Sequence, residues 1–313
     1  MGCTSQRAQQ VRMTNINDLS TDYCTITVNA IEKVKNTQAI YFKEIQGLDT
    51  AKFAADTLNP RKSKEAGELL SELTSLKNKK VLEIGTGCGV THISWTNLYN
   101  IDGYGIEPEG FGFDESGAIG RQLILDNGLD PTRIVNGTGE NMPFSDNTFD
   151  IVYSSNVLEH TQDPSKVLLE SVRVLKRGGL AHIITPNYWS YFDGHYAAFH
   201  PPIFSNRFFC WWVKVICKKN PEFAKTIRTE LNPHWVTKQL KLISRNTPIE
   251  LISLGQATFK KRMLNAHTGN WMALGKLQRL IVLTKHLKLS WLAAIVIIAL
   301  KGWTPLIISI KKT

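Results

Sequence analysis

The stretch that decides the fold is VLEIGTGCG, at residues 81–89. A short apolar run of strand type ends there in a loop with glycine at three alternating positions, Gly85, Gly87 and Gly89. Because glycine has no Cβ, such a loop lets the chain turn sharply into a helix and lets the backbone approach a ligand closely. The spacing is not the G-x-G-x-x-G of dinucleotide sites, and by itself it is a weak signal. The neighbouring segments must therefore decide what the loop binds.

Strand-type and helix-type segments alternate around this loop. We expect strands at 81–84, 101–107, 133–136, 149–155 and 180–185. We expect helices at 63–77 with Ser63 as the N-cap, at 90–99, at 116–127, and from Asp163-Pro164 to a stop at 176–179. The alternation predicts an α/β fold, Rossmann-like and doubly wound, with helices on both faces of a mostly parallel sheet. Ligands of such sheets lie beyond the carboxyl ends of the strands, where the strand order reverses.

Two acidic residues sharpen the interpretation of the glycine loop. Glu107 lies 22 residues beyond Gly85, at the end of the second expected strand, where a carboxylate can accept both hydroxyls of a ribose. Glu83 lies inside the first strand, where a dinucleotide-binding strand would continue apolar. A ligand with a ribose and no phosphate suits this loop as well as a dinucleotide does.

A longer pattern follows further along the chain. Residues 137–179 read GTGENMPFSDNTFDIVYSSNVLEHTQDPSKVLLESVRVLKRGG. Together with VLEIGTGCGV and GIEP, this pattern resembles the class I S-adenosylmethionine-dependent methyltransferases. It is most similar to the type 11-like subgroup that includes quinone-biosynthesis C-methyltransferases and many glycan and lipid methyltransferases. The resemblance covers roughly residues 65–187, is specific for the cofactor and says little about the acceptor of the methyl group.

The resemblance implies a set of cofactor-binding residues. The loop would surround the methionine part of S-adenosylmethionine, Glu107 would bind the ribose, and the residues around Gly139 would border the adenine. The implied positions are Glu83, Gly85, Thr86, Gly87, Gly89, Glu107, Pro108, Thr138, Gly139, Glu140, Asn156 and Val157. Thr138 departs from the family, which usually has Asp there. A hydroxyl accepts a hydrogen bond without charge assistance, so we expect cofactor binding that is intact but weaker.

Candidates for contact with the acceptor follow the last parallel strand, in PNYWSYFDGHYAAFHPP at 186–202. His195 and His200 are the candidates for a general base or for substrate contact, with Asp193 and Tyr191 behind them. His160, in the family motif, is a further candidate for substrate contact. Each histidine also has a purely structural interpretation, as a packed or helix-start residue. No Cys-x-x-Cys pair is present, which argues against a zinc site, and we expect no metal.

The ends of the chain differ from this core. Residues 1–40 are polar and weakly periodic, and we expect a loosely attached arm. We divide the chain into an N-terminal arm and cap (1–62), the cofactor-binding core (63–187) and a substrate-covering region (188–313). The last region holds a basic, aromatic helix at 205–219 and two strands, 248–254 and 304–310. These strands fit the antiparallel hairpin that closes the family's seven-stranded sheet.

Charge is distributed unevenly. Residues 201–313 contain 19 Lys/Arg and 3 Asp/Glu, against 18 and 24 in residues 1–200. A basic third with six of the eight tryptophans favours an anionic partner, such as a membrane surface or a phosphorylated acceptor. An odd number of cysteines and a polar N-terminus without an apolar core predict a reducing, cytoplasmic location, at the inner face of a membrane if one is bound.

The apolar run within 271–300, LSWLAAIVIIAL, has three interpretations. About ten residues, from Trp291 to Leu300, are half of the ~20 that a membrane span needs, so a span would have to run on to Ile310. The other interpretations are a buried core helix and a helix that lies in the membrane interface.

These observations predict a methyltransferase that acts on a small, sugar-linked or lipid-linked acceptor by O- or C-methylation. An RNA or protein methyltransferase that uses the basic region is the first alternative, although the aromatic residues accompany long aliphatic runs rather than a polar groove. A non-catalytic, cofactor-binding scaffold is the second. A dehydrogenase is the third, and the loop spacing argues against it. The oligomeric state stays open.

Overall fold

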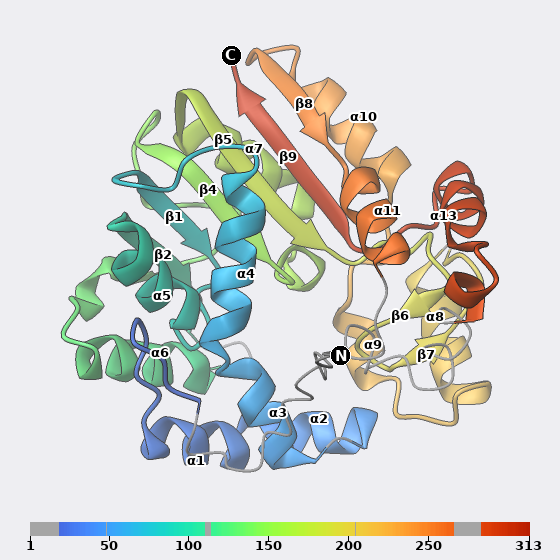
Figure 1. Cartoon of the computed structure of the whole chain (residues 1–313), viewed down its shortest axis with the longest axis horizontal. Helices are drawn as coiled ribbons and strands as arrows, with labels where there is room; N and C mark the ends of the chain where they lie inside the picture. Colours follow the sequence, from blue (N-terminus) through green and yellow to red (C-terminus); the bar gives the residue numbers. More distant parts are fainter. Residues whose placement is uncertain (1–18, 48, 110–113, 204, 266–282) are drawn as a thin grey trace, which may run out of the picture.

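The protein is described by a computed structural model that covers residues 19–47, 49–109, 114–203, 205–265 and 283–313. In this part of the chain, seven strands form one sheet in the order β3-β2-β1-β4-β5-β9-β8 (Figure 1). The strands are β1 (Lys80–Ile84), β2 (Asp102–Glu107), β3 (Ile134–Asn136), β4 (Phe149–Ser155), β5 (Leu175–Thr185), β8 (Ile249–Ser253) and β9 (Leu306–Lys312). The first five are parallel, and β9 runs antiparallel to both β5 and β8. The predicted fold class and the closing hairpin are confirmed.

The strands are buried from both sides. Val81 and Ile151 pack in one apolar cluster with α4 (Pro60–Ser71) and α5 (Val90–Tyr99). Their neighbours Leu82 and Val152 point to the opposite face and pack with α7 (Pro164–Val174) and α10 (Pro233–Ile243). Successive side chains of a strand alternate between faces, so these continuous apolar runs require helices on both. The order reverses between β1 and β4, which places the glycine loop at the switch point.

Two predicted boundaries are wrong by several residues. The helix expected at 63–77 spans Pro60–Ser71, because Asn59 caps it and Pro60 occupies its first position. Ser63 is instead buried within the helix, and its hydroxyl lies 3.1 Å from that of Thr91. Strand β5 begins at Leu175 rather than at residue 180, since Leu175 already pairs with Phe149. The expected helix at 116–127 is α6 (Asp114–Asp126).

The expectation of a loose N-terminal arm is wrong for residues 19–40. They contribute α1 (Val28–Asn36) and the start of α2 (Gln38–Gln46), followed by α3 (Thr50–Thr57). Leu19, Ile31 and Val34 are fully buried in a cluster that includes side chains of α5 and α6. The apolar positions that form this core are few and widely spaced, so the segment looked polar in sequence. Residues 1–18 lie outside the described residues.

The structure of the C-terminal region argues against two of the three interpretations of the apolar run. Residues 306–312 form a sheet strand, which excludes a membrane span that runs to Ile310. The helix α13 (Ser290–Ala299) buries only Ser290 and Ala294, so it is not a core helix. No helix within the described ranges has the length and apolar character to cross a membrane. Residues 271–282 of the run lie outside the described residues.

Short elements connect β5 to the closing hairpin. They are the two-stranded ribbon of β6 (Phe192–Asp193) and β7 (Ala198–Phe199), then α8 (Asn206–Val215) and α9 (Glu222–Thr226), and beyond β8 the helix α11 (Gln256–Leu264). The expected helix at 205–219 is α8. In Figure 1 the ribbon, α8, α9 and α13 lie together on one side, beyond the carboxyl end of β5. This placement brings the 186–202 segment next to the switch point.

Candidate active site

The glycine loop has the conformation that its sequence predicts. Gly85, Gly87 and Gly89 all have positive φ, at 72°, 54° and 74°. A Cβ at Gly85 would lie only 2.2 Å from Val157, so the loop packs directly on the end of β4. A Cβ at Gly87 would meet no atom of the described residues within 4 Å. Gly87 therefore borders open space, as a residue that faces a ligand must.

Two buried carboxyl groups lie beside the loop. The backbone N–H of Gly87 donates to Glu107 Oε2 at 2.9 Å, although the two residues come from different strand ends. Burial raises the pKa of Glu107, and the Gly87 N–H partly offsets this effect. Burial also raises the pKa of Glu83 to about 8, and the charge of Glu107 adds to the rise. No hydrogen bond reaches Glu83 Oε2 from any described residue.

This geometry fits S-adenosylmethionine. The buried, unpaired oxygen of Glu83 calls for a hydrogen-bond donor or a cation, because a polar atom buried without a partner is costly. Two neighbouring carboxyl groups favour a positively charged ligand, and the cofactor has a sulfonium and an ammonium group. The open side of Gly87 leaves room for it. The arrangement agrees with the predicted roles of Glu83, Gly87 and Glu107.

The remaining predicted cofactor residues have varied surroundings. Glu140 Oε1 accepts from the backbone N–H groups of Gln162 and Asp163, so this carboxylate holds the start of α7. Gly139 is buried, and a Cβ there would press on Val167 and Ile84. Asn156 is exposed at a positive φ of 55°, and its N–H donates to Ile184 O.

Three further predicted positions lie on the same strand ends. Thr86 is buried against Gly105, Pro108 is half-buried after β2, and Thr138 forms a backbone bridge with Asn141. None of these contacts excludes a cofactor role.

A second group of polar side chains meets beyond β4 and β5. Glu159 follows β4 and is completely buried, and its Oε1 lies 3.9 Å from His160 Nε2 and 3.8 Å from His195 Nε2. His195 comes from the ribbon, 35 residues further along, and its Nδ1 lies 3.3 Å from Asp193 Oδ1. The imidazole rings of His160 and His195 are nearly perpendicular, with centroids 5.1 Å apart. Sequence reasoning named both histidines, and the structure brings them together.

The two histidines differ in charge state. Burial lowers the pKa of His160 to about 3, and the neighbouring His195 acts in the same direction, so His160 stays neutral. Burial also disfavours charge on His195, but the hydrogen bond and the charge of Asp193, together with Glu159, outweigh it and raise its pKa. The cluster thus holds one neutral imidazole and one that gains a proton readily.

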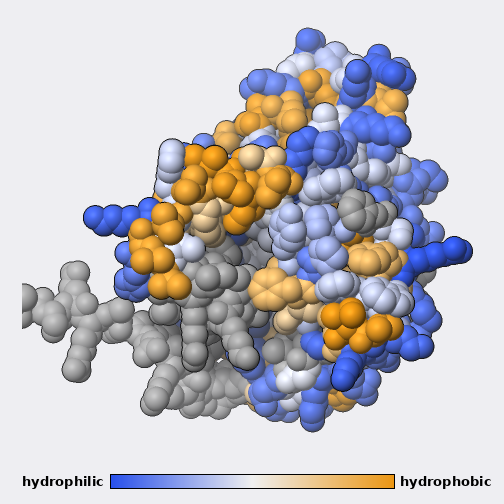
Figure 2. Space-filling model, turned by 90° about the vertical axis from the view of Figure 1, so that its right-hand side faces the viewer, coloured by the Kyte–Doolittle hydropathy of each residue, from blue (hydrophilic) through white to orange (hydrophobic). Residues whose placement is uncertain are grey.

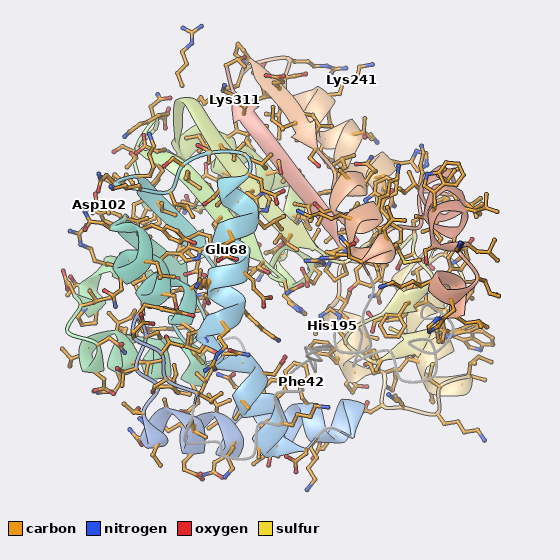
Figure 3. The ribbon with its side chains drawn as sticks, viewed as in Figure 1. Phe42, Glu68, Asp102, His195, Lys241 and Lys311 are labelled. Atoms are coloured by element: carbon orange, nitrogen blue, oxygen red, sulfur yellow. The ribbon has the colours of Figure 1, made fainter. Side chains whose placement is uncertain are left out.

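Aromatic side chains cover this cluster. Phe223, from α9, contacts both imidazoles, with centroid separations of 5.5 Å from His160 and 5.3 Å from His195. Phe42, from α2, packs edge-on against Phe223 at 5.9 Å. Figure 3 shows Phe42 and His195 facing the same region from opposite sides. The N-terminal helices therefore help to enclose the site, together with the region after residue 188.

The other predicted acceptor contacts lie elsewhere. His200 is 4% exposed; its Nδ1 lies 2.7 Å from Pro201 O, and its ring packs on Phe209. Tyr191 is exposed and lies against Gly302, at the end of α13. Neither residue belongs to the Glu159 cluster, although nothing in their surroundings excludes contact with a large acceptor.

Comparison with known proteins decides the class of the core. A family described as a methyltransferase domain, of type 11, matches residues 82–183. This stretch contains β1, β2, β4 and the glycine loop. The chain contains a class I S-adenosylmethionine-dependent methyltransferase domain. The fold and the resemblance of the sequence agree with this assignment.

Curated methyltransferases match part of this chain. An uncharacterized methyltransferase of Mycolicibacterium paratuberculosis is 31% identical over 121 residues, which cover 39% of this chain and 44% of that protein. The 2-methyl-6-phytyl-1,4-hydroquinone methyltransferase 1 of Oryza sativa subsp. japonica is 29% identical over 136 residues, 42% of this chain and 34% of that one. The chain therefore matches less than half the length of these relatives.

One solved structure extends the comparison of folds. The putative sarcosine dimethylglycine methyltransferase of Galdieria sulphuraria is 14% identical and aligns with 91% of this chain and 98% of its own, with a TM-score of 0.50. This similarity concerns the fold alone. It shows that the similarity of fold extends well beyond the matched 102 residues.

Sequence reasoning missed three residues of the cluster around His160 and His195. Glu159, Phe42 and Phe223 come from separate segments, and only the fold brings them to the histidines. Glu159 directly precedes His160 within the family motif and follows the apolar pair Val157-Leu158, so its position was an available signal. No local pattern marks Phe42 or Phe223.

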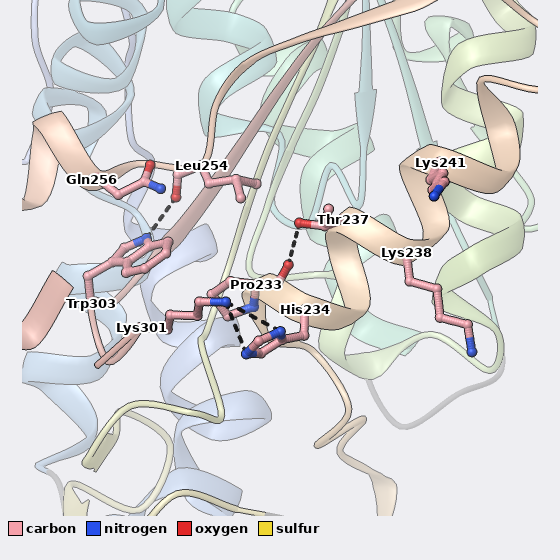
Figure 4. A pocket seen from close by; sticks show the side chains of 9 residues that line it. All are labelled: Pro233, His234, Thr237, Lys238, Lys241, Leu254, Gln256, Lys301 and Trp303. Atoms are coloured by element: carbon pink, nitrogen blue, oxygen red, sulfur yellow. Dashed lines mark hydrogen bonds between the residues drawn. The ribbon is translucent and has the colours of Figure 1, made fainter. Parts of the chain in front are cut away.

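A separate pocket of about 440 Å³ lies between α10 and the end of β8 (Figure 4). Lys238, Lys241 and Lys301 line it, and none of the described residues that line it is acidic. Lys301 Nζ lies within 3.4 Å of both ring nitrogens of His234, and Trp303 Nε1 donates to Leu254 O. None of the predicted cofactor or acceptor residues borders this basic pocket.

Proposed function

We propose that the whole chain is an S-adenosylmethionine-dependent methyltransferase that methylates an oxygen or carbon atom of a lipid-linked or sugar-linked acceptor at a membrane surface. The observation that carries the activity is the pair of buried carboxyl groups, Glu83 and Glu107, around the open side of Gly87. The histidine cluster supports an acceptor site next to it. Both lie at the carboxyl ends of β1, β2 and β4.

The proposed roles follow from this geometry. When bound, S-adenosylmethionine supplies an activated methyl group that leaves a neutral thioether. The chain holds the acceptor in line with this group, and such positioning is worth up to about 7–11 kcal/mol of a reaction barrier. Asp193 orients the ring of His195 through Nδ1, which leaves Nε2 beside Glu159 Oε1. A base placed there is needed only if the acceptor atom must lose a proton, and contributes on the order of 10²–10⁴-fold.

Apolar side chains on α13 support a membrane surface as the place of action. Trp291, Leu292 and Val296 are 54%, 51% and 47% exposed. Figure 2, which faces this side of the molecule, shows the apolar side chains gathered into a large patch. Exposed Lys285 and Lys288 precede the helix, and Lys301 follows it. An apolar helix face with lysines at its ends is suited to the interface of an anionic bilayer.

The basic pocket fits the same proposal. Two of its lining residues, Lys301 and Trp303, follow α13 directly in the chain. Three lysines without an acidic partner in the lining can hold a phosphate group. We propose that this pocket holds the anionic headgroup of a lipid when α13 rests on the bilayer.

Calorimetry tests the activity class first. We expect the purified chain to bind S-adenosylmethionine and not NADH. The substitution Gly87→Arg fills the open side of the loop, and Glu107→Ala removes the ribose acceptor, so each should abolish or greatly weaken binding while the fold is retained. Binding of neither ligand would favour the scaffold alternative. Binding of NADH would favour a dehydrogenase.

Liposome binding tests the membrane proposal independently. We expect binding to anionic vesicles at low salt that weakens as salt increases. The double variant Leu292→Glu/Val296→Glu should lose about tenfold or more in affinity, because two apolar side chains no longer enter the bilayer. The matched control is Leu125→Glu, since Leu125 on α6 is similarly exposed, at 56%, far from α13 in sequence. Equal loss in both variants would refute α13 as the docking surface.

The same preparation addresses the alternative of an RNA methyltransferase. RNA binding that falls steeply with salt and ignores sequence, together with no liposome binding, would favour that alternative. Methylation of a protein substrate in a cell extract would favour a protein methyltransferase.

A further inference from the structure

Three side chains beyond β4 and β5 form a compact set of metal-binding donors. Glu159, His160 and His195 each offer one ligand atom, and the three atoms all lie within 4.8 Å of one another. Two imidazoles and one carboxylate are the donors of many sites for zinc and for other divalent transition metals. The family motif supplies Glu159 and His160 as neighbours, but the third donor comes from the ribbon and is brought there only by the fold.

The carboxylate of Glu159 lacks a partner for one of its oxygens. Thr185 Oγ1 donates to Oε2 at 3.0 Å, whereas Oε1 is buried with no hydrogen-bond partner among the described residues. This is the same oxygen that faces both histidines. A fully buried carboxylate oxygen is strongly destabilising unless a donor or a cation satisfies it.

The third donor is held in a fixed orientation. Asp193 Oδ1 lies 3.3 Å from His195 Nδ1, and Asp193 Oδ2 accepts from the backbone N–H of Tyr196 at 2.6 Å. A carboxylate that binds one ring nitrogen leaves the other as a lone-pair donor and fixes the ring plane. The Nε2 atom of His195 is thereby directed toward Glu159 Oε1. Metal-binding histidines are oriented by a carboxylate or a carbonyl in the same way.

We propose that Glu159 Oε1, His160 Nε2 and His195 Nε2 bind one divalent transition-metal ion, with Asp193 as the residue that positions His195. The donor set favours Zn²⁺, Co²⁺ or Fe²⁺ over Mg²⁺ and Ca²⁺, which prefer oxygen ligands. This site is distinct from the cofactor loop, and its existence does not depend on the proposed function.

Small side-chain movements suffice to close the site. With bonds of about 2.0–2.1 Å, tetrahedral donors lie roughly 3.4 Å apart. The distances from Glu159 Oε1 to the two imidazoles are 3.8 and 3.9 Å, so each must shorten by only about 0.5 Å. The two imidazole donors lie within 4.8 Å of each other and must approach by at most about 1.4 Å. The His160 and His195 side chains are 24% and 13% exposed, which leaves an approach from the acceptor side. Three protein donors leave at least one coordination position for a further ligand.

The competing explanation is an ion pair. If His195 is protonated, it partly compensates the charge of Glu159 without a metal. In that case the cluster is a structural pair, and added metal would compete poorly with the proton.

Titration of the tag-free chain with Co²⁺, without S-adenosylmethionine, separates the two explanations. We expect visible absorption that saturates at one Co²⁺ per chain, is displaced by Zn²⁺ and lacks thiolate charge-transfer bands. Glu159→Gln and His195→Asn should abolish it. Asp193→Asn keeps all three donors and should weaken binding by about 10–100-fold, the usual effect of losing an orienting partner. His200→Asn and His234→Asn are controls for adventitious binding by other histidines.

Three results would each overturn the metal site. No saturable absorption in the wild-type chain, thiolate bands, or unchanged binding in folded Glu159→Gln protein would overturn the proposal. Because the wild-type spectrum alone reports the ligand type, the test stands even if a variant fails to fold. Failure of this test leaves the cofactor titration unaffected, and loss of cofactor binding leaves this one intact.

Discussion

The two halves of the candidate site are built in opposite ways. In the cofactor half, Glu83, the glycine loop and Glu107 lie within 25 consecutive residues, on two adjacent parallel strands. In the acceptor half, Phe42, Glu159, His195 and Phe223 come from four separate segments. The local sequence pattern predicts the cofactor half, whereas the residues of the acceptor half come together only when the chain folds.

The halves also differ in what they leave exposed. The cofactor half lies in the part of the chain with an excess of acidic residues and is surrounded by buried polar groups. The acceptor half adjoins the basic third, where α13 presents apolar side chains to solvent. We infer from this contrast that the cofactor half is built for a single ligand, S-adenosylmethionine. The acceptor half is built for contact with a surface and with a substrate.

The largest expected effect comes from Gly85, which packs against Val157 after the end of β4. Gly85→Ala places a Cβ 2.2 Å from Val157 and requires a left-handed conformation, so we expect a loss of about 2–5 kcal/mol in the free energy of unfolding. Urea denaturation measures it.

The variant Gly85→Ala/Val157→Ala removes the clashing methyl groups and should recover part of the loss. Gly87→Ala is the matched control, because it has a similar φ and open space, and should cost only about 1–2 kcal/mol. Equal losses at both positions would show that the left-handed backbone conformation, rather than contact with Val157, causes the loss of stability.

The second prediction concerns the buried charge of Glu83. Its pKa is about 8 in the folded chain against 4.5 for the free group, so the folded state binds the proton more tightly. The stabilising effect is complete below pH 4.5 and is lost as the pH rises to about 8, by on the order of 4 kcal/mol. Glu83→Gln should therefore unfold with less dependence on pH over this range and be more stable than wild type at pH 8–9, without cofactor.

Exposed Glu65→Gln is the control and should follow the wild-type pH profile. The same Glu83→Gln variant should bind S-adenosylmethionine more weakly. A Glu83→Gln protein with unchanged pH dependence and unchanged affinity would remove Glu83 from the cofactor half.

The third prediction separates the halves kinetically. Asp193→Asn should lower kcat by about 10²-fold, since His195 loses its orienting partner, and should leave the Kd for S-adenosylmethionine within about twofold. Turnover assays and calorimetry measure the two quantities. A parallel loss of cofactor affinity would mean that the two halves are one cooperative unit.

The smallest expected effect comes from the N-terminal cover. Phe42→Leu removes the ring that stacks on Phe53 at 4.7 Å and packs edge-on against Phe223, so we expect about 1 kcal/mol of destabilisation. The KM for the acceptor should rise several-fold with little change in cofactor affinity. Phe144→Leu is a comparable control, because Phe144 packs edge-on against Phe149 at 5.0 Å, at the end of β4 opposite to Glu159. An unchanged KM would mean that only the region after residue 188 encloses the acceptor site.

Sequence alone determined the core of this protein. Strands 149–155 and helix 90–99 are found at the predicted residues, and the glycine loop, Glu83 and Glu107 are where the motif implies. These features are local: the apolar periodicity, the positive-φ glycines and the spacing of the acids are each set by neighbours in the chain.

Tertiary structure decided the rest. Residues 19–40 looked loose because their core contacts are distant in sequence. The early start of α4 is different, since Asn59-Pro60 is a local signal that the choice of Ser63 as N-cap overlooked. The pairing of Glu159 with His195, the cover of Phe42 over Phe223 and the exposure of α13 each depend on which segments the sheet order brings together. Such contacts join residues tens to hundreds of positions apart, and no local pattern encodes them, because their free energy arises only when the whole sheet is formed.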